Sequence, residues 1–324
     1  MNQPTSLSTR QARDIMPHLL LTALAALIVL PSLRLADSLP VALELLTHFQ
    51  PQYALACVAL AGLFAWRRRR VPMVLALAAL LLNGSALMPW YKPLPEAVAS
   101  PGGVSLRILH ANVNAWNDDF ESLAELVRRE RPDVLALQEF STPWRDALAG
   151  LADMYPHSVG EPDDGPFGIA LYSRFPFTTQ RVVVLVEGGT PSIDVTVDVH
   201  GTAVRMLSTH PFPPMGSEMF GLRNDQLDAI AKELGATTQP TILMGDLNAT
   251  PWSPYYQDLE RATGLQNVRR GFGVIATWPA LLGPLGIPID HVLVSDGVGV
   301  VDVRAGADIG SDHLPLVVDL SVGG

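Results

Sequence analysis

One stretch decides how this chain is interpreted: Thr241-Ile242-Leu243-Met244-Gly245-Asp246-Leu247-Asn248-Ala249. Its first half is an apolar run with a β-branched start, which predicts a buried strand. Gly245 breaks the run, and two polar side chains follow at alternate positions. Because residues i and i+2 of an extended chain point to the same side, Asp246 and Asn248 are expected to face one cleft. The alternative is a strand that ends in a local turn, which both residue types favour.

These two side chains suit a particular chemistry. An Asp carboxylate binds a hard metal ion or accepts a proton from water, and an Asn amide donates a hydrogen bond to a phosphate oxygen. The pattern is short, so its interpretation depends on the rest of the chain.

The composition predicts membrane segments. The chain has 324 residues, of which 48% are hydrophobic and only 17% charged, with a mean hydropathy of +0.24. That is more apolar than an ordinary soluble protein, and the excess lies before residue 92. Cys57 is the single cysteine, which excludes an internal disulfide.

Charge divides the chain into two unlike parts. Residues 1–92 carry 8 basic and 3 acidic side chains, which leaves 14 of the 22 basic and 29 of the 32 acidic residues for the remainder, a balance of −15. Non-specific binding of duplex DNA needs Lys and Arg to neutralise phosphates, so this acidic part is poorly suited to it. A small or membrane-borne phosphate ester fits better, and metal ions would offset clustered carboxylates locally.

Three apolar segments precede the acidic part, at about residues 15–35, 51–66 and 71–91. A spanning helix needs about 20 apolar residues, so the first and third are long enough and the second is marginal. Trp90-Tyr91 ends the third segment as an interfacial aromatic pair does. The alternatives are a cleaved signal peptide for the first segment and a buried helical core for all three, but further apolar segments follow and polar faces are scarce.

Arginines set the expected orientation of these spans. Arg67 to Arg70 lie between the second and third segments, and Arg10 and Arg13 precede the first. Since basic residues stay cytoplasmic, three spans place everything after Tyr91 outside the cytoplasm, in the periplasm of a bacterium-like cell. This topology depends on the second segment. Residues 1–92 are thus predicted to form a multi-pass transmembrane region, residues 93–104 a Pro/Gly linker, and residues 105–324 a separate domain.

Strands outnumber helices in that domain, which predicts a layered α+β sandwich. Helices are expected around residues 120–131, 217–234 and 254–262. Strands are expected at 105–111, 134–137, 167–172, 181–186, 192–199, 203–208, 241–244, 289–294 and 316–320.

Polar residues gather where these strands end: Asn112, Glu139, His210, Asp246, Asn248, Asp290, Asp312 and His313. Their order resembles the endonuclease/exonuclease/phosphatase superfamily, over about residues 106–320. The motifs that carry the resemblance are Leu137-Gln138-Glu139, Gly245-Asp246-Leu247-Asn248, Ser311-Asp312-His313-Leu314-Pro315 and the strand Gly168 to Arg174, with Asn112, Thr209-His210 and Ile289-Asp290 in support.

The resemblance implies a DNase-I-like, four-layer αββα sandwich with a metal-dependent site at one edge of its paired sheets. Glu139 would hold Mg²⁺ or Mn²⁺, with Asn112 and Asp312 near it or helping to ligate it, because all-oxygen ligands suit these ions.

The resemblance also implies the catalytic roles. Asp246 would orient and deprotonate the attacking water, and Asn248 would position the water or the phosphate. His313, oriented by Asp290, would hydrogen-bond the scissile phosphate, and His210 would contact it from the other side.

Three neighbouring side chains invite misassignment. His291 follows Asp290, but alternation along a strand points it to the opposite face. Arg223 and Gln226 lie one turn apart on an expected helix and either help to shape the site or serve the surface or the structure; the second interpretation is favoured.

The preferred function is a membrane-anchored, metal-dependent phosphoesterase whose partners are a phosphate-ester substrate and the lipid bilayer. A lipid headgroup or small phosphodiester is favoured as substrate. The alternatives are an endonuclease or exonuclease, since much of the family cuts nucleic acid, and a catalytically inactive, membrane-tethered binding module. A transporter is disfavoured because the apolar segments hold almost no ionisable residues at their centres.

Overall fold

The computed structural model describes residues 9–92, 103–235 and 239–323, and it divides into two units, Met1–Met88 and Pro89–Gly324. Each unit is considered by itself. The predicted linker, residues 93–104, falls almost entirely outside the described residues. The predicted domain limits therefore stay a prediction.

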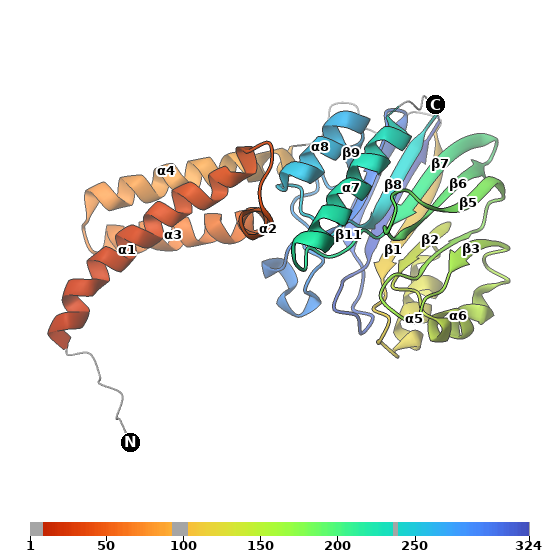
Figure 1. Ribbon diagram of the computed structural model, residues 1–324, viewed down its shortest axis with the longest axis horizontal. Coiled ribbons are helices and arrows are strands. Elements are labelled where there is room, and N and C mark those ends of the chain that lie inside the picture. The colour runs from red at the N-terminus through yellow and green to blue at the C-terminus, as the bar shows by residue number, and fades with distance from the viewer. Residues whose placement is uncertain (1–8, 93–102, 236–238, 324) are drawn as a thin grey trace, which may run out of the picture. The chain divides into compact units, whose positions relative to one another are not determined.

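The first unit is built from three helices that pack together, α1 (Thr9–Ser32), α3 (Gln50–Trp66) and α4 (Arg70–Leu87), as Figure 1 shows. The short elements η1 (Leu33–Leu35), α2 (Val41–Glu44) and η2 (Leu45–Phe49) connect α1 to α3. Small side chains such as Cys57, Ala76 and Ala79 are buried where the helices meet. Small residues allow helix backbones to approach closely, as in membrane helix packing.

One helix among the described residues, Arg70–Tyr91, is long and apolar enough to cross a membrane, judged by length and composition alone. Leu19–Leu35 is a shorter apolar helix, and α3 has 17 residues. The three-span topology stays a prediction.

Trp90, in η3 (Met88–Tyr91), corrects one expectation. Its side chain is buried, with its ring edge-on to Trp252 at 6.5 Å and the Arg270 guanidinium 5.1 Å from its centre. Its carbonyl oxygen accepts hydrogen bonds from the backbone N–H groups of Gly271 and Gly273. Trp90 is therefore part of the second unit's packing, and the prediction that it lies at a lipid interface is wrong.

Two six-stranded sheets form the second unit (Figure 1). The first has the order β11-β12-β1-β2-β4-β3 and the second β5-β6-β7-β8-β10-β9. The strands are β1 (Val104–Asn112), β2 (Val134–Gln138), β3 (His157–Glu161), β4 (Ile169–Ser173), β5 (Phe177–Val184), β6 (Pro191–Val199), β7 (Thr202–Thr209), β8 (Thr241–Asp246), β9 (Gln266–Asn267), β10 (Asp290–Val294), β11 (Val298–Ala305) and β12 (Leu316–Val322).

Helices cover the outer face of each sheet. The first sheet carries α5 (Phe120–Glu130) and α6 (Thr142–Ala147), with the 3₁₀ turn η4 (Leu148–Leu151) after them, and the second carries α7 (Ser217–Leu234) and α8 (Pro254–Thr263). A further 3₁₀ segment, η5 (Ala280–Leu285), precedes β10. The four-layer αββα sandwich that the family resemblance implies is thus the fold that the chain adopts.

Strand β8 shows why the deciding stretch is apolar on both sides. Ile242 and Met244 point into the core between the two sheets, whereas Leu243 points outward against α7 and α8. A strand covered on both faces needs apolar residues at consecutive positions rather than in alternation. The continuous run that opens the stretch follows from this double burial.

Strand directions bring the polar residues to one edge. β1 runs parallel to β2, and β7 runs parallel to β8, so the carboxyl ends of both pairs lie at the same end of their sheets. β10 is antiparallel to β8, with Asp290 opposite Asp246 in the register. Residues that follow β2 and β7 and residues that begin β10 therefore gather at one end of the sandwich.

Candidate active site

Asp246 ends β8 and lies at the centre of the candidate site. It is 1% exposed; its Oδ1 accepts the backbone N–H of Asn248 at 2.9 Å, and its Oδ2 accepts the Asn112 amide at 3.2 Å. Asn248 has a left-handed backbone (φ 49°), so a local turn, not strand alternation, brings it beside Asp246. Its side-chain amide donates to the carbonyl of Pro211 at 3.0 Å.

Asn112, at the end of β1, connects Asp246 to Glu139. Its amide nitrogen also donates to Glu139 Oε1 at 3.0 Å, while Glu139 Oε2 accepts the backbone N–H of Ala115 at 3.1 Å. Glu139 and Asn114 both have left-handed backbones, with φ of 55° and 58°. Non-glycine residues held in this region cluster at functional sites, because surrounding contacts must stabilise them.

A chain of buried side chains runs from His110 through Asp290 to His313. Asp290 Oδ1 lies 3.1 Å from His110 Nε2, and its Oδ2 lies 2.9 Å from His313 Nδ1. The other ring nitrogen of His313 faces Asp246 Oδ2 at 3.7 Å, a charge contact too long for a hydrogen bond. The predicted Asp290–His313 pair is thus in direct contact.

This arrangement keeps His313 protonated. Burial alone would lower its pKa, but the charges of Asp290 and Asp246 and the hydrogen bond to Asp290 outweigh that effect and raise the pKa to about 10. The pKa of Asp290 moves the opposite way: burial would raise it, and the two neighbouring histidines hold it well below its usual range. At neutral pH the pair is therefore an imidazolium and a carboxylate.

His210 approaches Asp246 from the second sheet. It is 3% exposed, and its Nε2 lies 3.5 Å from Asp246 Oδ2. Burial lowers its pKa, but its contact with Asp246 and the charge of Glu139 prevail and raise it. Two imidazole rings therefore point at one carboxylate from two sides, an arrangement suited to holding the oxygens of a phosphate group.

Two sets of side chains compete as the position of a divalent cation. Among the described residues, Asp246, Asp290 and His313 have ligand atoms within 4.8 Å of one another. Both nitrogens of His313 face carboxylates, however, and a protonated ring has no lone pair for a metal. Glu139 instead supplies carboxylate oxygens, which Mg²⁺ and Mn²⁺ prefer, whereas Asn112 turns its amide nitrogen toward Glu139 and its Oδ1 toward the backbone N–H of Asn114. The Glu139 carboxylate therefore suits such an ion, and both sets of side chains stay candidates for its position.

Asp312 is connected to Glu139 and Asn112 indirectly. Its Oδ1 accepts the Asn114 amide at 2.8 Å and its Oδ2 accepts the indole N–H of Trp278 at 3.0 Å. The backbone N–H of Asn114 in turn donates to Asn112 Oδ1 at 3.0 Å. The structure thus brings Asp312 to the same edge as Glu139 and Asn112, with Asn114 between them.

Sequence reasoning missed His110 and Asn114. His110 lies two residues before Asn112 on β1, so the alternation that pairs Asp246 with Asn248 on paper would have pointed to it. Its Nδ1 is buried and has no hydrogen-bond partner among the described residues. Because Asp290 is 180 positions away, only the fold reveals their contact.

His291 lies on the other face of β10, as predicted. Its Nε2 donates to the carbonyl of Ala249 at 2.8 Å, which leaves Nδ1 to accept the Asn267 amide at 3.0 Å. Burial and the charge of Arg269 lower its pKa well below the usual value, so the ring is neutral.

Arg223 and Gln226 are fully buried, so the surface alternative for them is wrong. Arg223 Nη1 donates to the carbonyl of Asn248 at 2.9 Å. Gln226 bonds the hydroxyls of Thr190 and Thr209, both at 3.0 Å; Thr209 directly precedes His210, and the Thr190 hydroxyl donates to the His210 carbonyl at 2.6 Å. Both side chains support the backbone beneath the site.

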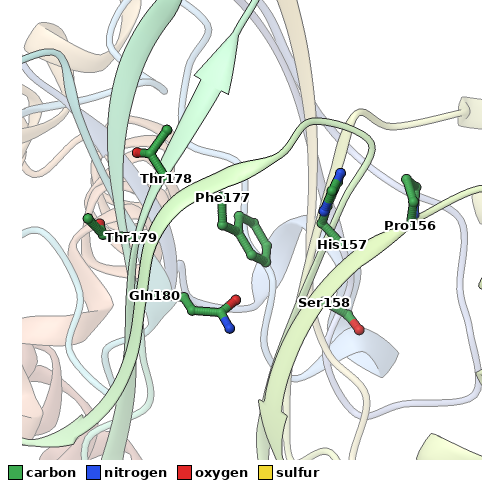
Figure 2. Close-up of a pocket in the computed structure, with 7 residues that line it drawn as sticks. All are labelled: Pro156, His157, Ser158, Phe177, Thr178, Thr179 and Gln180. Carbon is green, nitrogen blue, oxygen red and sulfur yellow. The ribbon is translucent and has the colours of Figure 1, made fainter.

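A separate pocket lies at the opposite end of the sandwich, between β3 and β5. Figure 2 shows the Phe177 ring beside His157, and their ring centres are 6.0 Å apart. His157 is level with Val134 across β4, whereas the site follows the other end of β2. None of the candidate site residues lines this pocket.

Comparison with known proteins agrees with this geometry. The model of the "Endonuclease/Exonuclease/phosphatase family" matches residues 108–313. An endonuclease/exonuclease/phosphatase from Beutenbergia cavernae is 25% identical, with a TM-score of 0.54 over 68% of this chain and 72% of that one. No curated protein matches the chain.

Two solved structures of lower identity share the fold. D. rerio TDP2 complexed with a single-strand DNA product is 17% identical, with a TM-score of 0.57 over 67% of this chain and 98% of that one. The human Nocturnin catalytic domain with bound sulfate is 21% identical, with a TM-score of 0.54 over 67% and 94%.

The fold and the edge site together define the class of protein: an α+β, DNase-I-like sandwich. With a family model matched over most of the second unit, the chain belongs to the endonuclease/exonuclease/phosphatase family.

Proposed function

We propose that the protein hydrolyses a phosphate ester by attack of water in a reaction that needs a divalent metal ion. The observation that carries this proposal is the convergence of His210 and His313 on Asp246, beside the pair Asn112 and Glu139. Such a site offers a base, two imidazole hydrogen-bond donors and a carboxylate for a metal ion within one edge of the sandwich. These are the parts that phosphoryl chemistry needs, because it depends on positioning and charge stabilisation.

Asp246 holds the attacking water and accepts its proton. The backbone N–H of Asn248 and the amide of Asn112 fix its carboxylate in one orientation. A base that is already oriented loses no freedom when the substrate binds, which favours the reaction.

His313 donates a hydrogen bond from Nε2 to a phosphoryl oxygen, and His210 does the same from the second sheet. Asp290 holds His313 through Nδ1 and keeps it protonated, and His110 holds the other oxygen of Asp290. Positive charge is thereby fixed where negative charge accumulates during the reaction.

Glu139 would hold Mg²⁺ or Mn²⁺, with Asn112 hydrogen-bonded to it and Asp312 connected to Asn112 through Asn114. When bound, the ion supplies charge neutralisation at the phosphoryl and leaving oxygens.

A small or lipid phosphate ester fits this site better than nucleic acid. Of the two basic pairs after the linker, Arg269-Arg270 is not free to build a phosphate-binding groove, since Arg269 is 1% exposed and Arg270 pairs with Glu260 at 3.0 Å. The other pair, Arg128-Arg129 on α5, forms ion pairs with Glu121 and Glu130. The acidic balance of the second part of the chain works in the same direction. The candidate span Arg70–Tyr91 supports a membrane-anchored enzyme with its site on the periplasmic side.

The test uses the purified full chain in detergent with three substrates side by side: bis(p-nitrophenyl) phosphate, single- and double-stranded DNA, and mixed micelles of phospholipid. Turnover that needs Mg²⁺ or Mn²⁺, stops with EDTA and is lost in Asp246→Asn establishes the esterase. Preferred cleavage of DNA would replace the small-ester or lipid assignment with a nuclease. A folded protein with no turnover on any of the three would contradict the proposal.

A further inference from the structure

Exposed apolar side chains gather on a segment that contacts Asp312 and His313 of the candidate site. Leu281 is 96% exposed, Leu285 56% and Leu282 50%, all in η5, and Trp278 just before it is 36% exposed. The whole segment from Gly271 to Ile289 contains no charged residue, although it belongs to a strongly acidic part of the chain. A soluble surface rarely presents neighbouring leucines to water in this way, and such a patch marks an interaction site.

These side chains are attached to the site through Asp312. The indole N–H of Trp278 donates to Asp312 Oδ2, the backbone N–H of Ala280 donates to the Asp312 carbonyl at 2.7 Å, and the Trp278 ring centre lies 6.4 Å from that of His313. Trp116, which is 74% exposed, follows Asn114, whose amide bonds the same carboxylate. We call Trp116, Trp278, Leu281, Leu282 and Leu285 the apolar rim.

Backbone hydrogen bonds join the two residues that flank η5, so the segment and its leucines are held in one conformation. The backbones of Trp278 and Ile287 exchange hydrogen bonds in both directions across the base. The backbone N–H of Leu282 bonds the Pro279 carbonyl at 3.0 Å within the segment. A segment ordered by its own backbone bonds can present apolar side chains without a protein surface to cover them.

A lipid layer is the occupant that the chain itself indicates. The same chain carries a helix, Arg70–Tyr91, that is long and apolar enough to cross a membrane. A loop free of acidic side chains also avoids repulsion by anionic lipid headgroups, and Trp and Leu are residue types that partition to membrane interfaces.

We propose that the apolar rim inserts among the acyl chains of a phospholipid layer, so that the headgroup phosphate of a lipid in that layer reaches Asp246 and His313. This inference rests on the proposed phosphoesterase function and names its substrate as a membrane lipid. Entry of even one exposed leucine into hydrocarbon is enough to change an equilibrium about tenfold.

The first experiment separates the rim from the chemistry. The full chain is reconstituted into phosphatidylcholine/phosphatidylglycerol vesicles, and Leu281→Ser/Leu285→Ser is compared with the matched control Val301→Ser. Val301 lies on β11 and is 53% exposed. We expect the double variant to lose at least about tenfold in phospholipid hydrolysis and to keep its rate on soluble bis(p-nitrophenyl) phosphate. The control should keep both rates.

The second experiment works even if no lipid is hydrolysed. An environment-sensitive dye is attached at Leu281→Cys in a Cys57→Ala background, and separately at Val301→Cys. Insertion predicts a blue-shifted emission in vesicles and quenching by doxyl-labelled lipid at position 281 only. Emission typical of water at position 281 would overturn the inference, whatever the enzyme cleaves.

Other outcomes also overturn it. Equal loss on soluble and vesicle substrates in the double variant would mean that the rim only shapes the site. A dye shift that needs high protein concentration in detergent and no lipid would identify a second copy of the chain as the occupant.

Discussion

The floor of the candidate site and the apolar rim lie side by side and are built in opposite ways. On the floor, Asp246, Asp290 and Asn112 are 0–1% exposed, and each contacts two or more polar partners. On the rim, leucines reach 96% exposure, and Trp278 supplies the side-chain hydrogen bond that joins them to the site. Chemistry requires groups that are fixed before the substrate arrives, whereas contact with a fluid surface does not. Changes on the floor should therefore affect every substrate, and changes on the rim only some.

The largest effect is expected from Asp246→Asn. The amide keeps the shape of the carboxylate but cannot accept a proton, so hydrolysis of bis(p-nitrophenyl) phosphate should fall by about 10³-fold. Circular dichroism of the purified variant checks that the fold is retained. A well-folded variant with more than a tenth of the wild-type rate would remove Asp246 from the role of base.

Glu139→Gln should act through the metal. An amide binds a divalent cation more weakly than a carboxylate, so the Mn²⁺ concentration at half-maximal binding should rise about 10- to 100-fold in calorimetric titration. Glu121→Gln, at an exposed acid on α5 that pairs with Arg128, serves as the control. If the two variants bind Mn²⁺ equally well, Glu139 is not a ligand.

The protonated His313 makes stability depend on pH. Its pKa is about 10 in the folded protein against an ordinary value of 6.5, so its contribution is fully present below pH 6.5 and is lost as the pH rises to about 10. Over this window the free energy of unfolding should fall by a few kcal/mol more, to order of magnitude, in the wild type than in His313→Asn. Denaturant titrations at pH 6.5, 8 and 10 measure the difference, and parallel curves would contradict it.

The smallest effect is expected at the rim. Leu281→Ser removes a side chain that is 96% exposed, so it should change the free energy of unfolding by less than about 0.5 kcal/mol. Leu207→Ser, at a buried position beneath α7, gives the contrasting large loss. A cooperative loss of stability in Leu281→Ser would show that the rim is part of the core.

The sequence predicted the strands that are buried and the polar residues that follow them. β3, with the sequence His-Ser-Val-Gly-Glu, was not predicted, because an edge strand with half-exposed residues carries no apolar pattern. β11 escaped because a bulge between Val300 and Asp302 shifts the register, and the buried Val300 and Val303 then break the period of two. A local hydrophobic pattern does not predict a strand that forms because it pairs with a neighbouring strand and not because its side chains are buried.

The site residues came from order along the chain, and their contacts came from the fold. Asp246, Asp290 and His313 were predicted together, but His110 was not, since a histidine in a buried strand has no local signal of its partner. Asn248 lies beside Asp246 as expected, but through the local turn that was the alternative to strand alternation. Trp90 was assigned to lipid because its neighbours are apolar, and its partners Trp252 and Arg270 lie far along the chain.

The position of Trp90 determines where the chain can be cut. A fragment that starts after the apolar segments, at residue 100 for example, discards the indole that covers Trp252 and the carbonyl that binds Gly271 and Gly273. It also discards Tyr91, whose ring lies over Gly273. In such a fragment, Trp252 and the backbone N–H groups of Gly271 and Gly273 would lose these contacts. A shortened protein meant for crystallisation or assay should therefore begin at Pro89, so that the last residues of the apolar helix travel with the enzyme.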